Sequence, residues 1–175
     1  MPDLSLALPR PIETDCGEYW TTYTQQVTAD DVLASLRQSG ERMEAWFQGV
    51  DEAKASTPYA PGKWSPKELL GHMLDTDRMF GVRTMAISRG ETQALFGFDQ
   101  DIYVTGGCFN DRSVANLLDE YRGLRASHLA LFSSLQPEQA ARRGNASGGD
   151  FTARAFPWIM AGHEIHHLKV LEERY

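Results

Sequence analysis

Two histidines, His163 and His167, stand four residues apart in the sequence AGHEIHHL of residues 161–168. On a helix this spacing places both imidazoles on one face, with their Cβ atoms about 5–6 Å apart. Two neutral imidazole nitrogens so placed can hold one divalent metal ion. A third histidine, His72, lies in another segment with strong helix signals. Taken singly, each is most simply a buried core histidine, but the pair together with the third residue predicts a metal site.

Three protein nitrogens leave at least one coordination position for water or substrate, which is typical of a catalytic rather than a structural metal. His166 lies about 100° around the helix from His167, so we expect it to point toward solvent or a partner, with direct coordination as the alternative. Asp75 follows His72 by three residues and is either a solvated charge or a hydrogen-bond acceptor for a ligand imidazole. Glu164 is expected to form hydrogen bonds or to face solvent, with a role as general base left open.

A fifth histidine, His128, falls on the apolar face of a further predicted helix. We interpret it as a core or pocket residue, with a proton shuttle near the metal as the sharper alternative. Tyr121 and Arg125 precede it on the same helix, and they line the same cavity or pack at the surface rim. The weak candidates for catalysis are therefore Glu164, His128 and Asp75.

Residues 163–167 also satisfy the pattern H-E-x-x-H of zinc proteases, in which Glu164 would be the base. Such proteases take a third ligand farther along the chain, and only residues 168–175 follow here. The extended form of the motif requires glycine and histidine where this chain has Val170 and Glu173. We also find no strand-bearing segment upstream, so the sequence disfavours a protease.

Bulk composition narrows the function further. A chain of 175 residues fits one domain, and its net charge of −7 argues against nucleic acids and anionic membranes as partners. No apolar run approaches the roughly 18 residues that span a bilayer, and residues 1–9 lack the features of a signal peptide. Cys16 and Cys108 are isolated. We predict two unpaired, inert thiols in a cytoplasmic protein, with one disulfide or a reactive thiol as alternatives.

The elements that must position the histidines follow from periodicity and capping signals. Residues 1–27 should form an irregular arm, and a helix capped by Thr28 should run to about Val50, with Asp31 completing a near capping box. Ser65-Pro66-Lys67-Glu68 carries a cap, a first-turn proline and an acid at the third position, which predicts a helix ending at Gly90. Residues 90–110 form a long aromatic connection that crosses the bundle or lines a site.

A third long helix is predicted from about Ser113 to Leu135, and a fourth from the cap Thr152 to the end. Pro157 should cost this helix one hydrogen bond and bend its start slightly, unless the helix begins a residue or two later. Residues 144–149 should form a flexible loop. With no strand predicted, residues 28–175 make an all-α four-helix bundle, in which 51–64 or 90–112 carries a crossover.

The segments WSPKELLGHMLD (64–75) and AGHEIHHLKVL (161–171) resemble the DinB-like (YfiT-type) family, and the resemblance covers roughly residues 28–175. It implies a four-helix bundle of unusual crossover order, with one divalent metal ion, zinc or nickel, held by His72, His163 and His167. The resemblance also implies a small-molecule substrate, and a homodimer because family members often pair.

The family resemblance implies two kinds of enzyme, and a third function is left open beside them. The first is a metal-dependent hydrolase that uses a metal-bound water, because the metal lowers the pKa of that water. The second is an S-transferase that attaches a low-molecular-weight thiol to an electrophile, or an isomerase that depends on such a thiol. Outside enzymes, the alternative is a stress-related protein that binds a metal or ligand.

Overall fold

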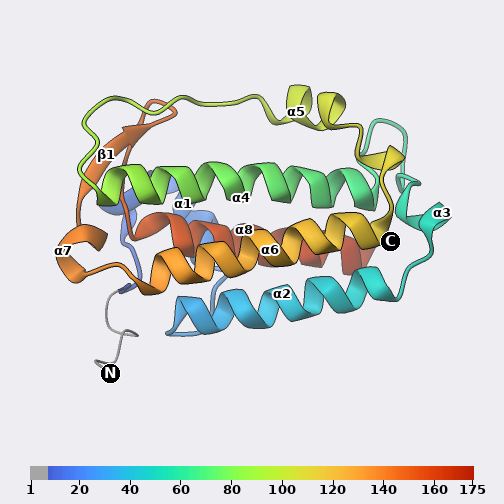
Figure 1. The fold of residues 1–175 in the computed structure, drawn as a ribbon, viewed down its shortest axis with the longest axis horizontal. Coiled ribbons are helices and arrows are strands. Elements are labelled where there is room, and N and C mark those ends of the chain that lie inside the picture. Colours follow the sequence, from blue (N-terminus) through green and yellow to red (C-terminus); the bar gives the residue numbers. More distant parts are fainter. Residues whose placement is uncertain (1–7) are drawn as a thin grey trace.

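Four long helices form the bundle, and residues 8–175 are described in this computed structural model (Figure 1). They are α2 (Val32–Gln48), α4 (Pro66–Ser88), α6 (Val114–Ser133) and α8 (Ala155–Arg174). Both α6 and α8 pack against α2 and α4, so the consecutive helices α2 and α4 lie diagonally across the bundle. The predicted all-α four-helix bundle is confirmed.

The crossover lies between α4 and α6. These neighbouring helices run in the same direction, and the chain between them returns along the length of the bundle (Figure 1). This connection is not purely irregular, because it contains α5 (Gln100–Gly107) and the short 3₁₀ helix η2 (Phe109–Asp111). Between α2 and α4 the chain instead reverses direction through the single turn α3 (Glu52–Ala55).

The predicted start of α4 is confirmed atom by atom. The Ser65 hydroxyl accepts a hydrogen bond from the Glu68 backbone N–H at 3.2 Å, and a Glu68 carboxylate oxygen accepts from the Ser65 N–H at 2.7 Å. For α2 the predicted cap was wrong by three residues. Asp31, not Thr28, accepts from the N–H groups of Leu33 and Ala34, because a carboxylate directly before the first helical residue reaches two free donors.

The predicted irregular arm was wrong for residues 13–24, which form α1 (Glu13–Thr24). Gly17 interrupts this helix at φ 79°, and the kink obscures the helical periodicity in the sequence. The helix packs along α8 so closely that a Cβ at Gly162 would lie 2.0 Å from the Tyr23 carbonyl oxygen. The expectation that residues 1–9 are no signal peptide falls mainly on residues outside those described.

Residues 143–152 are a hairpin rather than the predicted loop. Strands β1 (Arg143–Ala146) and β2 (Gly149–Thr152) pair antiparallel around Ser147 and Gly148, whose φ values of 52° and 78° suit a tight two-residue turn. Thr152 therefore ends a strand and caps nothing.

After the single turn α7 (Pro137–Ala140) and the hairpin, α8 begins at Ala155. Pro157 is then its third residue, where a helix has no backbone acceptor for an N–H, so no hydrogen bond is lost and no bend is required.

A layer of buried polar side chains divides the core in two. One apolar cluster gathers around Leu36 of α2, Phe80 of α4 and Trp158 of α8, and a second gathers toward the other end of the bundle. Each long helix places a buried polar residue in the interval between the clusters. These residues are Ser39, Asp77, Arg125 and Glu164.

The remaining expectations concern the thiols and membranes. Cys16 is buried and Cys108 exposed, and neither is in a disulfide. Within residues 8–175 no helix combines the length and the apolar character needed to cross a bilayer.

Candidate metal centre

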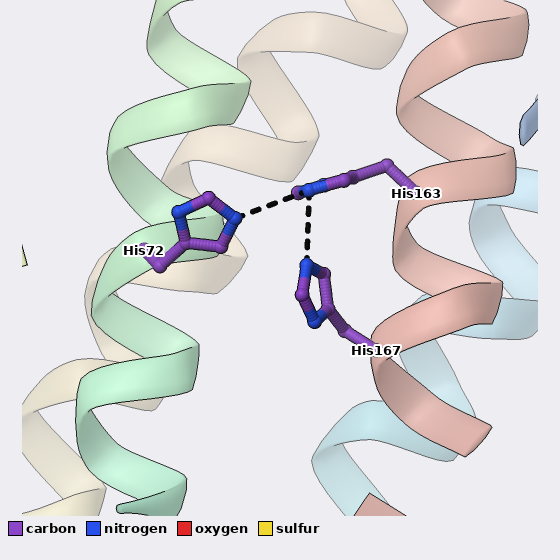
Figure 2. A group of neighbouring side chains, drawn as sticks. All are labelled: His72, His163 and His167. Atoms are coloured by element: carbon purple, nitrogen blue, oxygen red, sulfur yellow. Dashed lines mark hydrogen bonds between the residues drawn. The ribbon is translucent and has the colours of Figure 1, made fainter. Parts of the chain in front are cut away.

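Three imidazole nitrogens converge between α4 and α8 (Figure 2). The Nε2 atom of His163 lies 3.1 Å from Nε2 of His72 and 3.0 Å from Nε2 of His167. Nitrogens bound to one ion at about 2.0–2.1 Å are separated by about 3.0–3.4 Å, so this spacing matches a shared divalent metal. The structure thus brings together the three residues that the sequence singled out, and their role as ligands remains a prediction.

Burial keeps these imidazoles neutral, which is the form that binds a metal. Desolvation lowers the pKa of His72 to about 4. It also lowers the pKa values of His163 and His167 well below the ordinary value, and the neighbouring histidines lower them further. A neutral ring has one N–H and one lone pair, so protons alone cannot satisfy three nitrogens that face one another. A cation at their meeting point would satisfy all three.

The opposite ring nitrogens show how little else holds these rings. Thr76 Oγ1 lies 3.4 Å from Nδ1 of His72, a long contact from the next turn of α4. Among residues 8–175, the Nδ1 atoms of His163 and His167 are buried without a hydrogen-bond partner. Metal-binding histidines usually donate from this nitrogen to an oxygen. Here the orientation of His163 and His167 depends on packing.

Aromatic rings surround the three histidines. The Trp64 ring lies 4.9 Å from that of His72, and the rings of Tyr23 and Phe80 lie 5.5 and 6.1 Å from that of His163, measured between centroids. Such a shell lowers the local dielectric and strengthens any charge interaction with a bound ion.

Two cavities reach the cluster. We call the first, of about 250 Å³, the Trp64 cavity, and its walls include Tyr59, Lys63, Trp64, His166, His167 and Tyr175. The second, of about 270 Å³, is the Trp20 cavity, and its walls include Trp20, Tyr23, His72, Phe80, Arg83 and His163. Neither cavity is lined by α6, which the sequence had suggested as a wall. In the Trp20 cavity, α1 and the hairpin turn take its place.

The connection between α4 and α6 does line the site, as expected. Phe98 and Gln100 border the Trp20 cavity, and Asp101 borders the Trp64 cavity. Tyr19, Trp20 and Tyr23 of α1 join them. Their spacing suits packing onto the bundle, but nothing local in the sequence indicated that they would meet the histidines.

The weaker sequence candidates lie away from the three converging nitrogens. Asp75 pairs with Arg78 at 3.5 Å, whereas Thr76 is the polar neighbour of His72. His166 is half-buried beside the Tyr23 ring and outside the cluster. His128 stacks on Phe132, with ring centroids 5.6 Å apart, and borders neither cavity that reaches the histidines.

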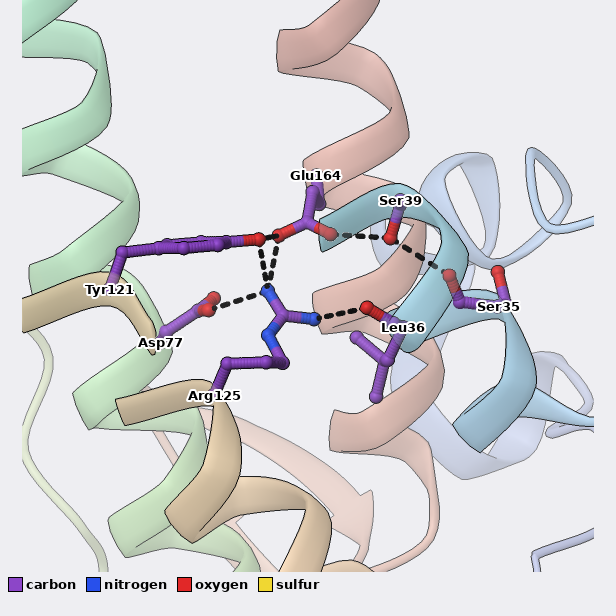
Figure 3. Close-up of polar contacts among 7 residues, drawn as sticks. All are labelled: Ser35, Leu36, Ser39, Asp77, Tyr121, Arg125 and Glu164. Carbon is purple, nitrogen blue, oxygen red and sulfur yellow. Dashed lines mark hydrogen bonds and ion pairs between the residues drawn. The ribbon is translucent and has the colours of Figure 1, made fainter. Parts of the chain in front are cut away.

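Glu164 points into the bundle core, toward Ser39, Tyr121 and Arg125 (Figure 3). It is fully buried and accepts hydrogen bonds from Ser39, from Arg125 and, at 2.6 Å, from the Tyr121 hydroxyl. With its oxygens so occupied it cannot act as a base at the histidines. This orientation also removes the basis of the protease interpretation, because in that motif the glutamate faces the metal.

Arg125 is the centre of this polar cluster. Its Nη2 atom donates to Glu164, to the Tyr121 hydroxyl at 3.2 Å and to Asp77 at 3.2 Å, while Nη1 donates to the Leu36 carbonyl at 3.3 Å. It therefore joins all four bundle helices. Burial and the charge of Glu164 raise the pKa of Asp77 to about 7 although Arg125 opposes the shift. Neither Tyr121 nor Arg125 lines the histidine cavities or the surface rim.

Comparisons with known proteins agree with this architecture. The family profile described as the DinB superfamily matches residues 35–171. YfiT from Bacillus subtilis, described as a probable metal-dependent hydrolase with an unusual four-helix bundle topology, is similar at a TM-score of 0.72 with 18% identity, over 98% of this chain and 97% of that one.

The mycothiol-dependent maleylpyruvate isomerase is similar at a TM-score of 0.67 with 13% identity. This match covers 82% of the present chain but only 61% of the isomerase. A histidine-to-alanine mutant of the same isomerase gives the same TM-score with 12% identity. Comparison with curated protein sequences gives no match.

Proposed function

This chain belongs to the DinB superfamily, and we propose that it is a metal-dependent enzyme acting on a small molecule. His72, His163 and His167 hold one divalent ion, zinc or nickel. The observation that carries this proposal is the meeting of three Nε2 atoms within 4.8 Å of one another, where each histidine also lines one of two cavities. A structural site would instead be closed by a fourth protein ligand.

A divalent ion in this position supplies a Lewis acid and lowers the pKa of a water or thiol that reaches it. The chain's own residues hold and enclose it. Thr76 steadies the His72 ring, and the rings of Tyr23, Trp64 and Phe80 exclude bulk water around the imidazoles.

Hydrolysis of a small molecule is the simplest reaction that this arrangement supports. A second candidate is transfer of a low-molecular-weight thiol to an electrophile. It is favoured by the two separate cavities, because His167 lines one while His72 and His163 line the other, so two reactants can approach from different sides. A non-enzymatic binding protein has less support, since that function predicts a closed site without an adjacent cavity.

Metal content tests the site directly. Untagged protein should contain about one equivalent of zinc or nickel by elemental analysis. His72→Ala and His163→Ala should each lose most of it. His166→Ala is the matched control, because His166 lies on the same helix and outside the cluster, and it should retain its metal. Substoichiometric metal that is unaffected by the ligand substitutions would contradict the proposal.

Turnover separates the two reactions. Metal-loaded protein is incubated with chromogenic esters and amides, and in parallel with monochlorobimane and a panel of cellular thiols. Thiol-independent turnover supports the hydrolase, and turnover that requires one thiol supports the transferase. Loss of either activity in His72→Ala ties it to the histidine cluster. A cytoplasmic location and a homodimer also remain predictions, and sedimentation analysis tests the second.

A further inference from the structure

A buried arginine without a carboxylate partner lines the same cavity as two of the histidines. Arg83 is 2% exposed and borders the Trp20 cavity together with His72 and His163. Burial lowers the pKa of its guanidinium. Its hydrogen-bond partners within residues 8–175 are a carbonyl and a hydroxyl, with no carboxylate among them. Buried charges are normally paired. A solitary buried cation in a cavity therefore indicates that the cavity takes an anion.

The guanidinium is held in place by only part of its hydrogen-bonding capacity. Its Nη2 atom donates to the Phe96 carbonyl at 3.0 Å and to the Ser147 hydroxyl at 2.6 Å. Ser147 lies in the hairpin turn, and the bridge between Leu95 and Ala146 fixes the Phe96 segment beside it. Nε of Arg83 is buried without a partner among the described residues. An arginine has five N–H donors in a planar fork that matches a carboxylate.

Along α4 the wall of the Trp20 cavity carries His72 at one end and Arg83 at the other, with Thr76 and the Phe80 ring between them. These four residues recur on one face of α4 at three- and four-residue steps. Eleven residues of helix separate the Cα atoms of His72 and Arg83 by about 16 Å. The guanidinium lies beside the Phe96 carbonyl and the Ser147 hydroxyl, and the cavity that it borders also reaches His72 and His163. Trp20 supplies an apolar wall from α1.

We propose that the Trp20 cavity binds a small organic carboxylate, with its charged end on Arg83, its apolar body against Trp20 and Phe80, and its far end at the histidines. Only the placement of the far end rests on the proposed metal-dependent function. The anion-binding end requires no metal, so the two proposals can fail separately.

A matched pair of ligands tests the charge requirement in metal-free protein, so that a carboxylate cannot bind an ion instead. The probes are 4-phenylbutyrate and its neutral amide, and their dissociation constants are measured by NMR titration. The wild-type protein should bind the carboxylate about tenfold or more tightly than the amide. Equal affinities would overturn the proposal without any variant being needed.

Variants then assign the preference to one residue. Arg83→Met, which keeps the side-chain length, should abolish the preference for the carboxylate, and Arg83→Lys should keep part of it. Arg89→Met removes an exposed arginine from the end of the same helix and should leave the preference unchanged. A preference that persists in Arg83→Met would overturn the assignment. If the protein binds inorganic phosphate but neither phenyl compound, the proposal that the ligand is an organic carboxylate is overturned.

Metal analysis of the same proteins as purified, before the metal is removed for the titrations, distinguishes the two proposals. Wild-type protein that lacks metal but prefers the carboxylate would refute the proposed function and leave the anion site standing. Arg83→Met with full metal content and no carboxylate preference supports both.

Discussion

Replacing Arg125 by methionine should cost this protein a large share of its stability. The substitution preserves apolar volume but leaves Glu164, which is fully buried, and Asp77, which is 2% exposed, without their shared cation. Removing one partner of a buried ion pair typically costs about 3–5 kcal/mol. Glu164 retains hydrogen bonds from Ser39 and Tyr121, so we expect the lower part of that range. The free energy of unfolding of a domain is only about 5–15 kcal/mol.

Urea unfolding, followed by tryptophan fluorescence and circular dichroism, measures this loss. Chelator is present throughout, so that metal binding does not add to the stability of the folded state. Arg122→Met is the control, because Arg122 lies one turn earlier, faces solvent and pairs with Glu44 and Asp119. Its loss should be a small fraction of that for Arg125→Met.

The double variant with Glu164→Gln isolates the pair from the rest of the cluster. If the unpaired carboxylate causes the loss, Glu164→Gln should recover about 1–3 kcal/mol in the Arg125→Met background. Strictly additive effects, or a loss no larger than that of Arg122→Met, would refute the reasoning. Additive effects would show that Arg125 stabilises the protein through packing alone. A loss as small as that of Arg122→Met would show that water replaces the arginine as a partner of the carboxylates.

Three further outcomes follow from the structure. The pKa of Asp77 is raised from 3.8 to about 7, so between these pH values the folded protein holds a proton on Asp77 that the unfolded protein has lost. The stability of the wild-type protein should therefore fall as pH rises from 5 to 8. In thermal melts, Asp77→Asn should reduce this dependence of stability on pH. Gly162→Ala puts a methyl against the Tyr23 carbonyl and should cost about 1–3 kcal/mol in urea unfolding, whereas Gly123→Ala, with open space around it, should be neutral or stabilising. Thr76→Val removes the hydroxyl beside the α4 imidazole and should weaken metal binding about tenfold in chelator competition.

Local signals explain what the sequence could predict. The four-residue interval between His163 and His167 and the cap at Ser65 each depend on neighbours within one helical turn. Predictions from such local signals hold in the folded protein because they do not depend on which helices pack together. The convergence of His72 with the α8 pair is a long-range contact, and its prediction rested on three histidines placed on two helices together with the resemblance of the two segments to a known family.

The polar cluster around Arg125 could not be predicted directly from the sequence. Arg125 contacts Glu164 and Asp77 across 39 and 48 residues of sequence, and no local period encodes such a pairing. One signal was present, because Leu118, Arg125 and Phe132 follow each other at seven-residue steps. A charge within that apolar stripe predicts a buried partner, although it does not say which one.

The hairpin and α1 were missed for different reasons. Each strand has only four residues and its turn is rich in glycine, so the segment resembles a loop in composition. The α1 helix lies behind Pro9 and Pro11 and is broken at Gly17, and its buried face becomes apparent only when it packs against α8.

The walls of the Trp20 cavity come from parts of the chain that differ in how freely they can change. The histidines stand on helices whose interior faces are filled by the core, so substitutions there disturb the whole bundle. Trp20, Phe98 and Ser147 instead lie on a peripheral helix, a connecting segment and a turn. Evolution or protein engineering can therefore alter the lining of this cavity by exchanging these outer segments, while the helices that carry the histidines are inherited unchanged.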